Sequence, residues 1–173
     1  MRPLYWIVLA LTVAVYATML VWTLPVISRE AAGLAAFDMR PGGYTFDEAK
    51  AFLEALTPRG RVLYLGPQHW LDLAYPLLLA IFTGWSILRL LPTGWLRRGA
   101  WLALLPIPGM IFDYIENGAV TAILTGDLKM LSPQLVAYAS QMTMLKSVFT
   151  SLSLTILLVL FLLWLWRRWR TAA

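Results

Sequence analysis

The chain has 173 residues, of which 60% are hydrophobic and only 13% are charged, too little charge to cover a soluble domain of this size. It contains no cysteine, which excludes disulfides, thiolate metal sites, iron–sulfur clusters and a cysteine nucleophile. Its single histidine, His69, argues against a haem held by two histidines and against a histidine-rich zinc site, so we expect neither a metal nor a cofactor.

The first predicted element is an apolar helix over residues 4–27. This stretch exceeds the roughly 7–15 apolar residues of a secretory signal peptide, and no clear small-x-small cleavage site follows it. We therefore expect a retained membrane helix, because about 20 apolar residues suffice for one crossing.

Residues 28–66 form the one sizeable extramembrane segment. Thr45 and Glu48 have the spacing of a capping box, and apolar residues recur after them at helical intervals up to Leu56. Pro58 and Gly60 end this pattern, which predicts a short amphipathic helix over about 46–57. Its apolar face is expected either to rest on the outer leaflet or to close over the end of the helical bundle.

Three further apolar stretches, at about 70–91, 99–124 and 135–166, complete a prediction of four membrane-crossing helices. Pro106, Pro108 and Gly109 predict a kink near 105–109 in the third. Ser132-Pro133 predicts the start of the fourth. A helix over 133–168 would be about 54 Å long, so its first ten or so residues should project beyond the outer surface or break away as a separate turn.

Basic residues are distributed unequally between the two sides of this predicted all-α membrane bundle. The segments at one side contain seven and no acid: Arg2, Arg89, Arg97, Arg98, Arg167, Arg168 and Arg170. The other side has six basic residues balanced by six acidic ones. The positive-inside rule then predicts a protein of the inner membrane with both termini in the cytoplasm. Five tryptophans lie near the predicted cytoplasmic interface. The excess of basic residues is thus explained by membrane orientation. We expect the chain to contact a lipid bilayer and not to bind nucleic acid.

Four charged residues, Asp72, Asp113, Glu116 and Lys146, fall within the apolar stretches at a similar depth. Each lies about 22–31 Å along its helix from the nearest cytoplasmic arginine, in the outer third of a core about 30 Å thick. Charged groups at such depth usually face a bundle interior, a watery cavity or the interface. The sequence predicts a polar site with these candidate residues: Asp113, Glu116, Asn117, Lys146, Asp72 and His69.

Asp113, Glu116 and Asn117 share one helix face, and Lys146 is the only base at their depth. We therefore expect Lys146 to pair with Asp113 or Glu116. Alternatively, Lys146 could extend to the outer headgroups, and Asp72 and His69 could simply be interfacial residues. A buried network could also serve only to hold the helices together.

The chain resembles a family of small, uncharacterised four-helix bacterial membrane proteins. The residues that carry this resemblance lie within about 37–120: the segment from Gly43-Tyr44 to Gly60-Arg61, the run from Asp72 to Tyr75-Pro76, and Asp113-Tyr114-Ile115-Glu116-Asn117. The resemblance implies four helices and a membrane location but no activity. A fainter architectural similarity links the chain to emopamil-binding and sigma-2-type proteins, with no motif matched residue by residue.

Three functions remain open. The first is a ligand-binding or accessory protein with an outward-facing polar pocket for a lipid, quinone or amine. The second is an enzyme on a lipid or isoprenoid substrate with Asp113 or Glu116 as general acid or base, although no catalytic motif is recognisable. The third is a structural or assembly subunit that contacts another membrane protein or a second copy of itself.

Overall fold

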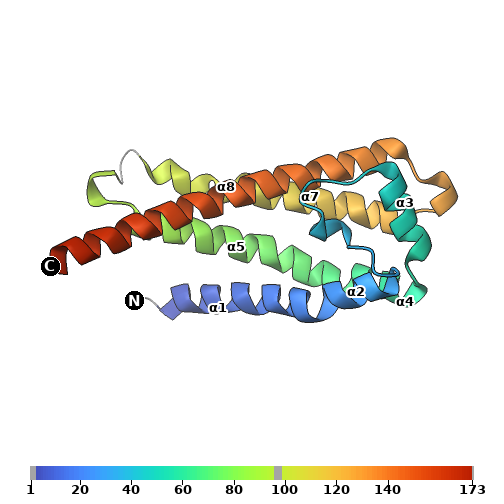
Figure 1. Cartoon of the computed structure of the whole chain (residues 1–173), viewed down its shortest axis with the longest axis horizontal. Helices are drawn as coiled ribbons and strands as arrows, with labels where there is room; N and C mark the ends of the chain where they lie inside the picture. Colours follow the sequence, from blue (N-terminus) through green and yellow to red (C-terminus); the bar gives the residue numbers. More distant parts are fainter. Residues whose placement is uncertain (1–2, 96–98, 173) are drawn as a thin grey trace.

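The computed structural model describes residues 3–95 and 99–172, and every regular element in those ranges is helical. The all-α prediction is therefore confirmed. The long helical segments run along one another, and α1 begins at the end of the molecule where α8 ends (Figure 1). Arg2, Arg97 and Arg98, which supported the predicted orientation, lie outside the described residues.

The first segment is a continuous helical run made of α1 (Pro3–Thr18), a π-helical turn (Met19–Thr23) and α2 (Leu24–Glu30). It extends three residues beyond the predicted end at 27. Pro25 explains the π-turn, because its ring has no N–H for the carbonyl of Val21 and crowds that carbonyl. Widening the preceding turn lets the helix continue past the proline.

The segment predicted to lie outside the membrane contains a 3₁₀ turn (Phe37–Met39) and α3 (Phe46–Ala55), which ends two residues before the predicted boundary. The capping box is confirmed: the Glu48 amide donates to Thr45 Oγ1 at 3.2 Å and the Thr45 amide donates to Glu48 Oε2 at 2.7 Å. The Thr45 amide lowers the pKa of the Glu48 carboxyl by stabilising its charged form. The apolar face of α3 is buried within the molecule, so α3 closes over the helical bundle.

The second segment begins twelve residues before the predicted start at 70. It comprises α4 (Pro58–Leu63), a second π-turn (Tyr64–Gln68) and α5 (His69–Leu90), which together form one run of 33 residues. Pro58 does end the α3 pattern, but it also occupies the first turn of α4, where a missing N–H has no cost. Thr57 caps that turn by accepting from the Gly60 amide at 3.1 Å.

The third segment changes helix type where the prolines predict a kink. A 3₁₀ stretch (Ala100–Leu104) leads into α7 (Pro106–Thr125). The fourth, α8 (Pro133–Ala172), is an unbroken helix of 40 residues that starts at the predicted proline. Its outer turns do not break away, because they support the extramembrane segment: Ser140 Oγ accepts a hydrogen bond from the Tyr44 amide at 2.8 Å.

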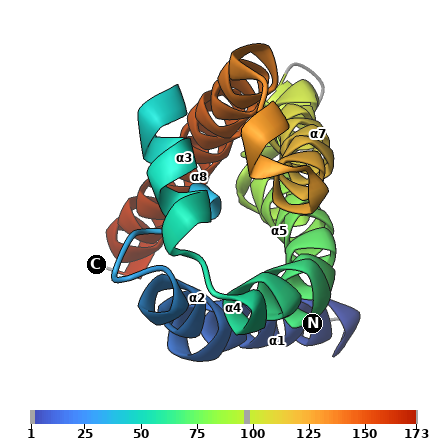
Figure 2. The same cartoon turned by 90° about the vertical axis from the view of Figure 1, so that its right-hand side faces the viewer.

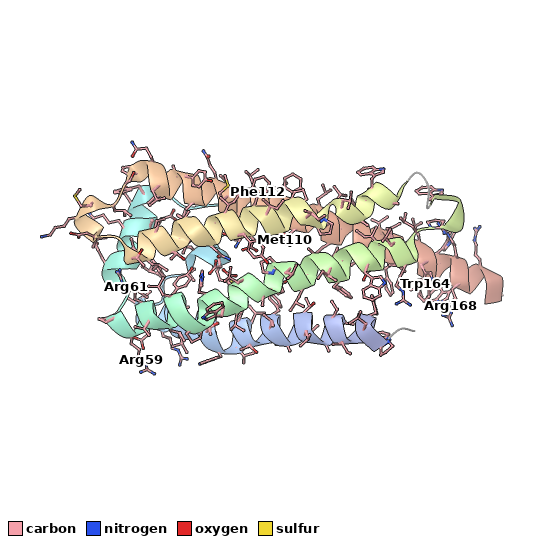
Figure 3. The ribbon with its side chains drawn as sticks, turned by 180° about the vertical axis from the view of Figure 1, so that it is seen from behind. Arg59, Arg61, Met110, Phe112, Trp164 and Arg168 are labelled. Atoms are coloured by element: carbon pink, nitrogen blue, oxygen red, sulfur yellow. The ribbon has the colours of Figure 1, made fainter. Side chains whose placement is uncertain are left out.

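Three helical runs are long and apolar enough to cross a membrane: Pro3–Glu30, Pro58–Leu90 and Pro133–Arg170. The 20-residue α7 is not one of them, since Asp113, Glu116 and Asn117 lower its apolar content. Arg59 and Arg61 lie at one end of the molecule, and Trp164 and Arg168 lie at the other (Figure 3). These features indicate a membrane protein.

Candidate functional site

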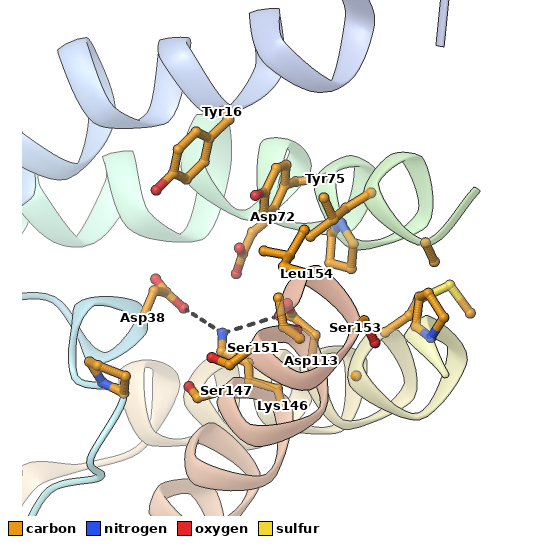
Figure 4. A pocket seen from close by; sticks show the side chains of 18 of the residues that line it. Tyr16, Asp38, Asp72, Tyr75, Asp113, Lys146, Ser147, Ser151, Ser153 and Leu154 are labelled. Atoms are coloured by element: carbon orange, nitrogen blue, oxygen red, sulfur yellow. Dashed lines mark hydrogen bonds and ion pairs between the residues drawn. The ribbon is translucent and has the colours of Figure 1, made fainter. Parts of the chain in front are cut away.

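Three of the predicted site residues, Asp113, Glu116 and Lys146, meet where α7 packs against α8. Lys146 Nζ lies 3.2 Å from Asp113 Oδ1, and it forms an ion pair with Glu116 Oε2. It also lies 3.7 Å from Oδ1 of Asp38, which comes from the extramembrane 3₁₀ turn (Figure 4). The Lys146 side chain is only 11% exposed, so it does not extend to the headgroups. We call Asp38, Asp113, Glu116 and Lys146 the polar cluster.

Hydrogen bonds hold two of these acids in place. Thr143, one turn before Lys146 on α8, donates to Glu116 Oε1 at 2.5 Å. Tyr64 donates from its hydroxyl to Asp38 Oδ2 at 2.8 Å, and the same hydroxyl accepts from the Phe37 amide at 3.2 Å. Side chains from four separate elements therefore fix the cluster, as a preorganised polar site requires.

Asn117 and Tyr114 join α7 to α5 instead of facing the cluster. Pro76 on α5 leaves the carbonyl of Asp72 without its helical donor, and Asn117 Nδ2 donates to that carbonyl at 3.2 Å. The Tyr114 hydroxyl donates to the neighbouring carbonyl of Leu73 at 3.0 Å. The structure thus gives Asn117 a partner within the protein backbone.

The structure does not bring His69 to the cluster. It is the first residue of α5, it is half-buried, and its ring packs against that of Trp70 at 6.2 Å. Asp72, one turn later, is 4% exposed and faces the cavity described below, with its carboxylate directed toward Asp38 in Figure 4.

Sequence reasoning missed Asp38, which it counted among the outer charges. Asp38 lies in a segment with no helical periodicity, so spacing could not place it. The nearest signal was its apolar surroundings, Ala36-Phe37 before it and Met39 after it, which are unusual in an exposed loop. Phe37 is in fact fully buried.

Four packed aromatic rings cover the end of the bundle that is predicted to face outward, beside the cluster. Ring centroids of Phe37 lie 4.8 Å from Tyr44 and 4.9 Å from Phe52, and Phe52 lies 6.2 Å from Tyr64. Burial raises the pKa of the Tyr44 hydroxyl above its usual range, and the nearby Glu116 carboxylate acts in the same direction. We call these four residues the outer aromatic cluster. Figure 2 looks onto the end of the molecule where α3 and α4 lie in front.

A cavity of about 280 Å³ extends from the polar cluster toward the middle of the molecule, between α1, α5, α7 and α8. Asp38, Asp72, Asp113 and Lys146 line its polar end. Its remaining walls are mainly apolar and include Met19, Leu79 and Met110. Hydroxyl side chains also line them: Thr83, Ser147, Thr150, Ser151 and Ser153. A cavity with charge at one end and apolar walls at the other matches the shape of an amphipathic molecule.

Acids outnumber bases around this cavity. Asp38, Asp72, Asp113 and Glu116 surround a single described cation, Lys146. Buried charge is costly unless it is paired, so the excess favours either protons on the carboxyls or an additional positive group. No set of three or more His, Asp or Glu within the described residues is arranged to hold a metal ion.

No known protein family, curated protein or solved structure matches this chain.

Proposed function

We propose that this chain is a multi-pass protein of the cytoplasmic membrane that binds an amphipathic molecule in the cavity between its helices. Four helical segments, α7 included, cross the bilayer in this proposal, and both termini lie in the cytoplasm. The polar head of the ligand meets Asp113 and its neighbours, and the tail lies against the apolar walls.

The main support for this proposal is that charged side chains with little exposure line a cavity. Asp113 and Lys146 are 14% and 11% exposed, yet both line a cavity of about 280 Å³. A network that only held helices together would be expected to have close-packed surroundings, because protein interiors leave few voids larger than a water molecule.

Native mass spectrometry of the protein released from its own membranes tests the proposal. We expect a small molecule to remain bound to the wild type and to be lost from Asp113→Asn. Asp127→Asn is the matched control, since Asp127 is exposed and away from the cavity. Retention of the ligand by Asp113→Asn, or absence of any ligand from the wild type, would contradict the assignment.

A second candidate, an assembly subunit, is favoured by the outer face of α8. Large apolar side chains on this face are exposed, among them Leu158, Val159, Phe161 and Leu162. They are available to lipid or to a partner helix. The same experiment separates the two functions: a co-purifying membrane protein, no small molecule and no effect of Asp113→Asn would support assembly.

A further inference from the structure

We propose that the cavity, taken as the ligand site of the proposed function, holds a long-chain primary amine that enters sideways from the bilayer between α1 and α8.

The end of the cavity under α3 and α4 is closed, and beside it Met39 and Pro41 line the cavity and are exposed. The outer aromatic cluster fills the space enclosed by α3 and α4, with Phe37 and Phe52 fully buried. The extramembrane segment is also attached to α8 twice, through Tyr44 and Ser140 and through Asp38 and Lys146. A ligand entering between α3 and α4 would have to displace these packed rings.

The side between α1 and α8 is open. α1 packs on α5, and α8 packs on α5 and α7, whereas α1 and α8 make no extended contact in the described part of the chain. Cavity-lining residues on this side are exposed: Tyr16 on α1 is 44% exposed and Leu154 on α8 is 40% exposed. Figure 4 shows Tyr16 on α1 and Leu154 on α8 among the residues that line the cavity.

The environment of Asp72 indicates that the head group of the ligand is a cation. This residue is 4% exposed, its carboxylate points into the cavity, and no hydrogen bond or ion pair reaches that carboxylate from the described residues. Lys146 is already shared by three other acids. A primary ammonium group supplies both the positive charge and the N–H donors that a buried carboxylate requires.

Two aromatic rings beside Asp72 fit the same cation. Tyr16 and Tyr75 both line the cavity, and their rings stack at a centroid distance of 5.1 Å. Ammonium groups bind favourably near the faces of such rings. An anionic head group would instead meet an uncompensated excess of carboxylates.

The volume of the cavity limits how much of the ligand's tail it can hold. Ligand pockets that enclose a whole small molecule usually measure about 300–1,000 Å³, and this cavity has about 280 Å³. The cavity therefore accommodates the head group and the first part of a long chain. The rest of the chain leaves between Tyr16 and Leu154 and lies in lipid.

The test compares three C16 compounds with different head groups, hexadecylamine, hexadecanol and hexadecanoate. Each is titrated into the wild-type protein in a non-ionic detergent, and occupancy is read by native mass spectrometry. We expect the amine to bind at least tenfold more tightly than the other two. Equal or tighter binding of the alcohol or acid would overturn the amine assignment while leaving an amphiphile pocket in place. Failure of all three, with no ligand from native membranes, would remove both proposals.

Two pairs of variants locate the site and its entrance. Asp72→Asn should weaken amine binding at least tenfold, whereas Asp47→Asn, on the exposed face of α3, should leave it unchanged. Leu154→Trp should block entry, whereas Leu158→Trp, one turn along α8 and outside the cavity lining, should not. Unchanged binding in Asp72→Asn, or equal effects of the two tryptophans, would overturn the corresponding part of the inference.

Discussion

At the scale of single residues, the stability of the polar cluster depends on Lys146. Its ammonium group is the described cation shared by the fully buried Glu116 carboxylate and the largely buried carboxylates of Asp38 and Asp113. Lys146→Met would leave those carboxylates without their counter-charge, and removing one partner of a buried pair costs about 3–5 kcal/mol. We expect a loss of that order in the free energy of unfolding, measured by denaturant titration in detergent.

Lys129→Met is the matched control, because Lys129 is exposed at the outer end, and its effect should stay within about 0.5 kcal/mol. Adding Glu116→Gln to Lys146→Met should recover part of the lost stability, because the fully buried Glu116 then carries no charge. Equal stability of Lys146→Met and wild type would show that the ion pairs contribute nothing.

The contact of Lys146 with Asp113 and Glu116 could be predicted from depth and helical spacing alone. Asp38 could not, since irregular chain carries no periodicity that fixes its position. Asn117 shows a different limit. Spacing placed it on the face of Asp113, yet the Asp72 carbonyl, freed by Pro76, receives its amide hydrogen bond. The unpaired carbonyl belongs to another helix, so the sequence around Asn117 does not predict this hydrogen bond. The ligand-binding role of all six candidate residues remains a prediction.

At the scale of elements, Gly109 sets how closely α7 approaches α8. A Cβ at this position would lie 3.0 Å from Thr150 Oγ1 and 3.4 Å from the Thr150 backbone nitrogen. Gly109→Val should therefore force the helices apart and destabilise the protein by about 1–3 kcal/mol, as overpacking does. Thermal unfolding in detergent measures the loss.

The control for this change is Gly118→Val, on the same helix. A Cβ at Gly118 meets nothing within 4 Å, so this variant has the same change in helix propensity without the clash. If both variants lowered the unfolding temperature equally, propensity and not the α7–α8 contact would be responsible.

The elements that sequence reasoning placed correctly are those with local signals. The Thr45–Glu48 capping box, the break before Pro106 and the start of α8 at Pro133 all depend on a few neighbouring residues. The early start of the second segment was missed because a proline such as Pro58 is compatible with both the end and the start of a helix. It ends one helix and begins another, and only the Thr57 cap distinguishes the two cases.

At the scale of the whole molecule, α1 begins and α8 ends at one end, and α3 and α4 lie at the other (Figure 1). Arg89 contacts the Tyr5 ring at 4.6 Å and Arg170 contacts the Trp166 ring at 4.2 Å at the terminal end. Arginine above aromatic rings is typical of residues at a membrane interface. Hydropathy alone identifies three crossings, so the topology depends on whether α7 provides a fourth.

Cysteine labelling decides whether α7 crosses, and the natural absence of cysteine makes single-site labels clean. Gly94 precedes α7 and Lys129 follows it, and both are exposed. If α7 spans the membrane, these positions lie on opposite faces. Lys129→Cys should react with a membrane-impermeant maleimide in intact cells, and Gly94→Cys should react only after permeabilisation. Labelling of both in intact cells would show that α7 does not cross. Labelling of Gly94→Cys alone would keep four crossings but invert the orientation that the arginines predict.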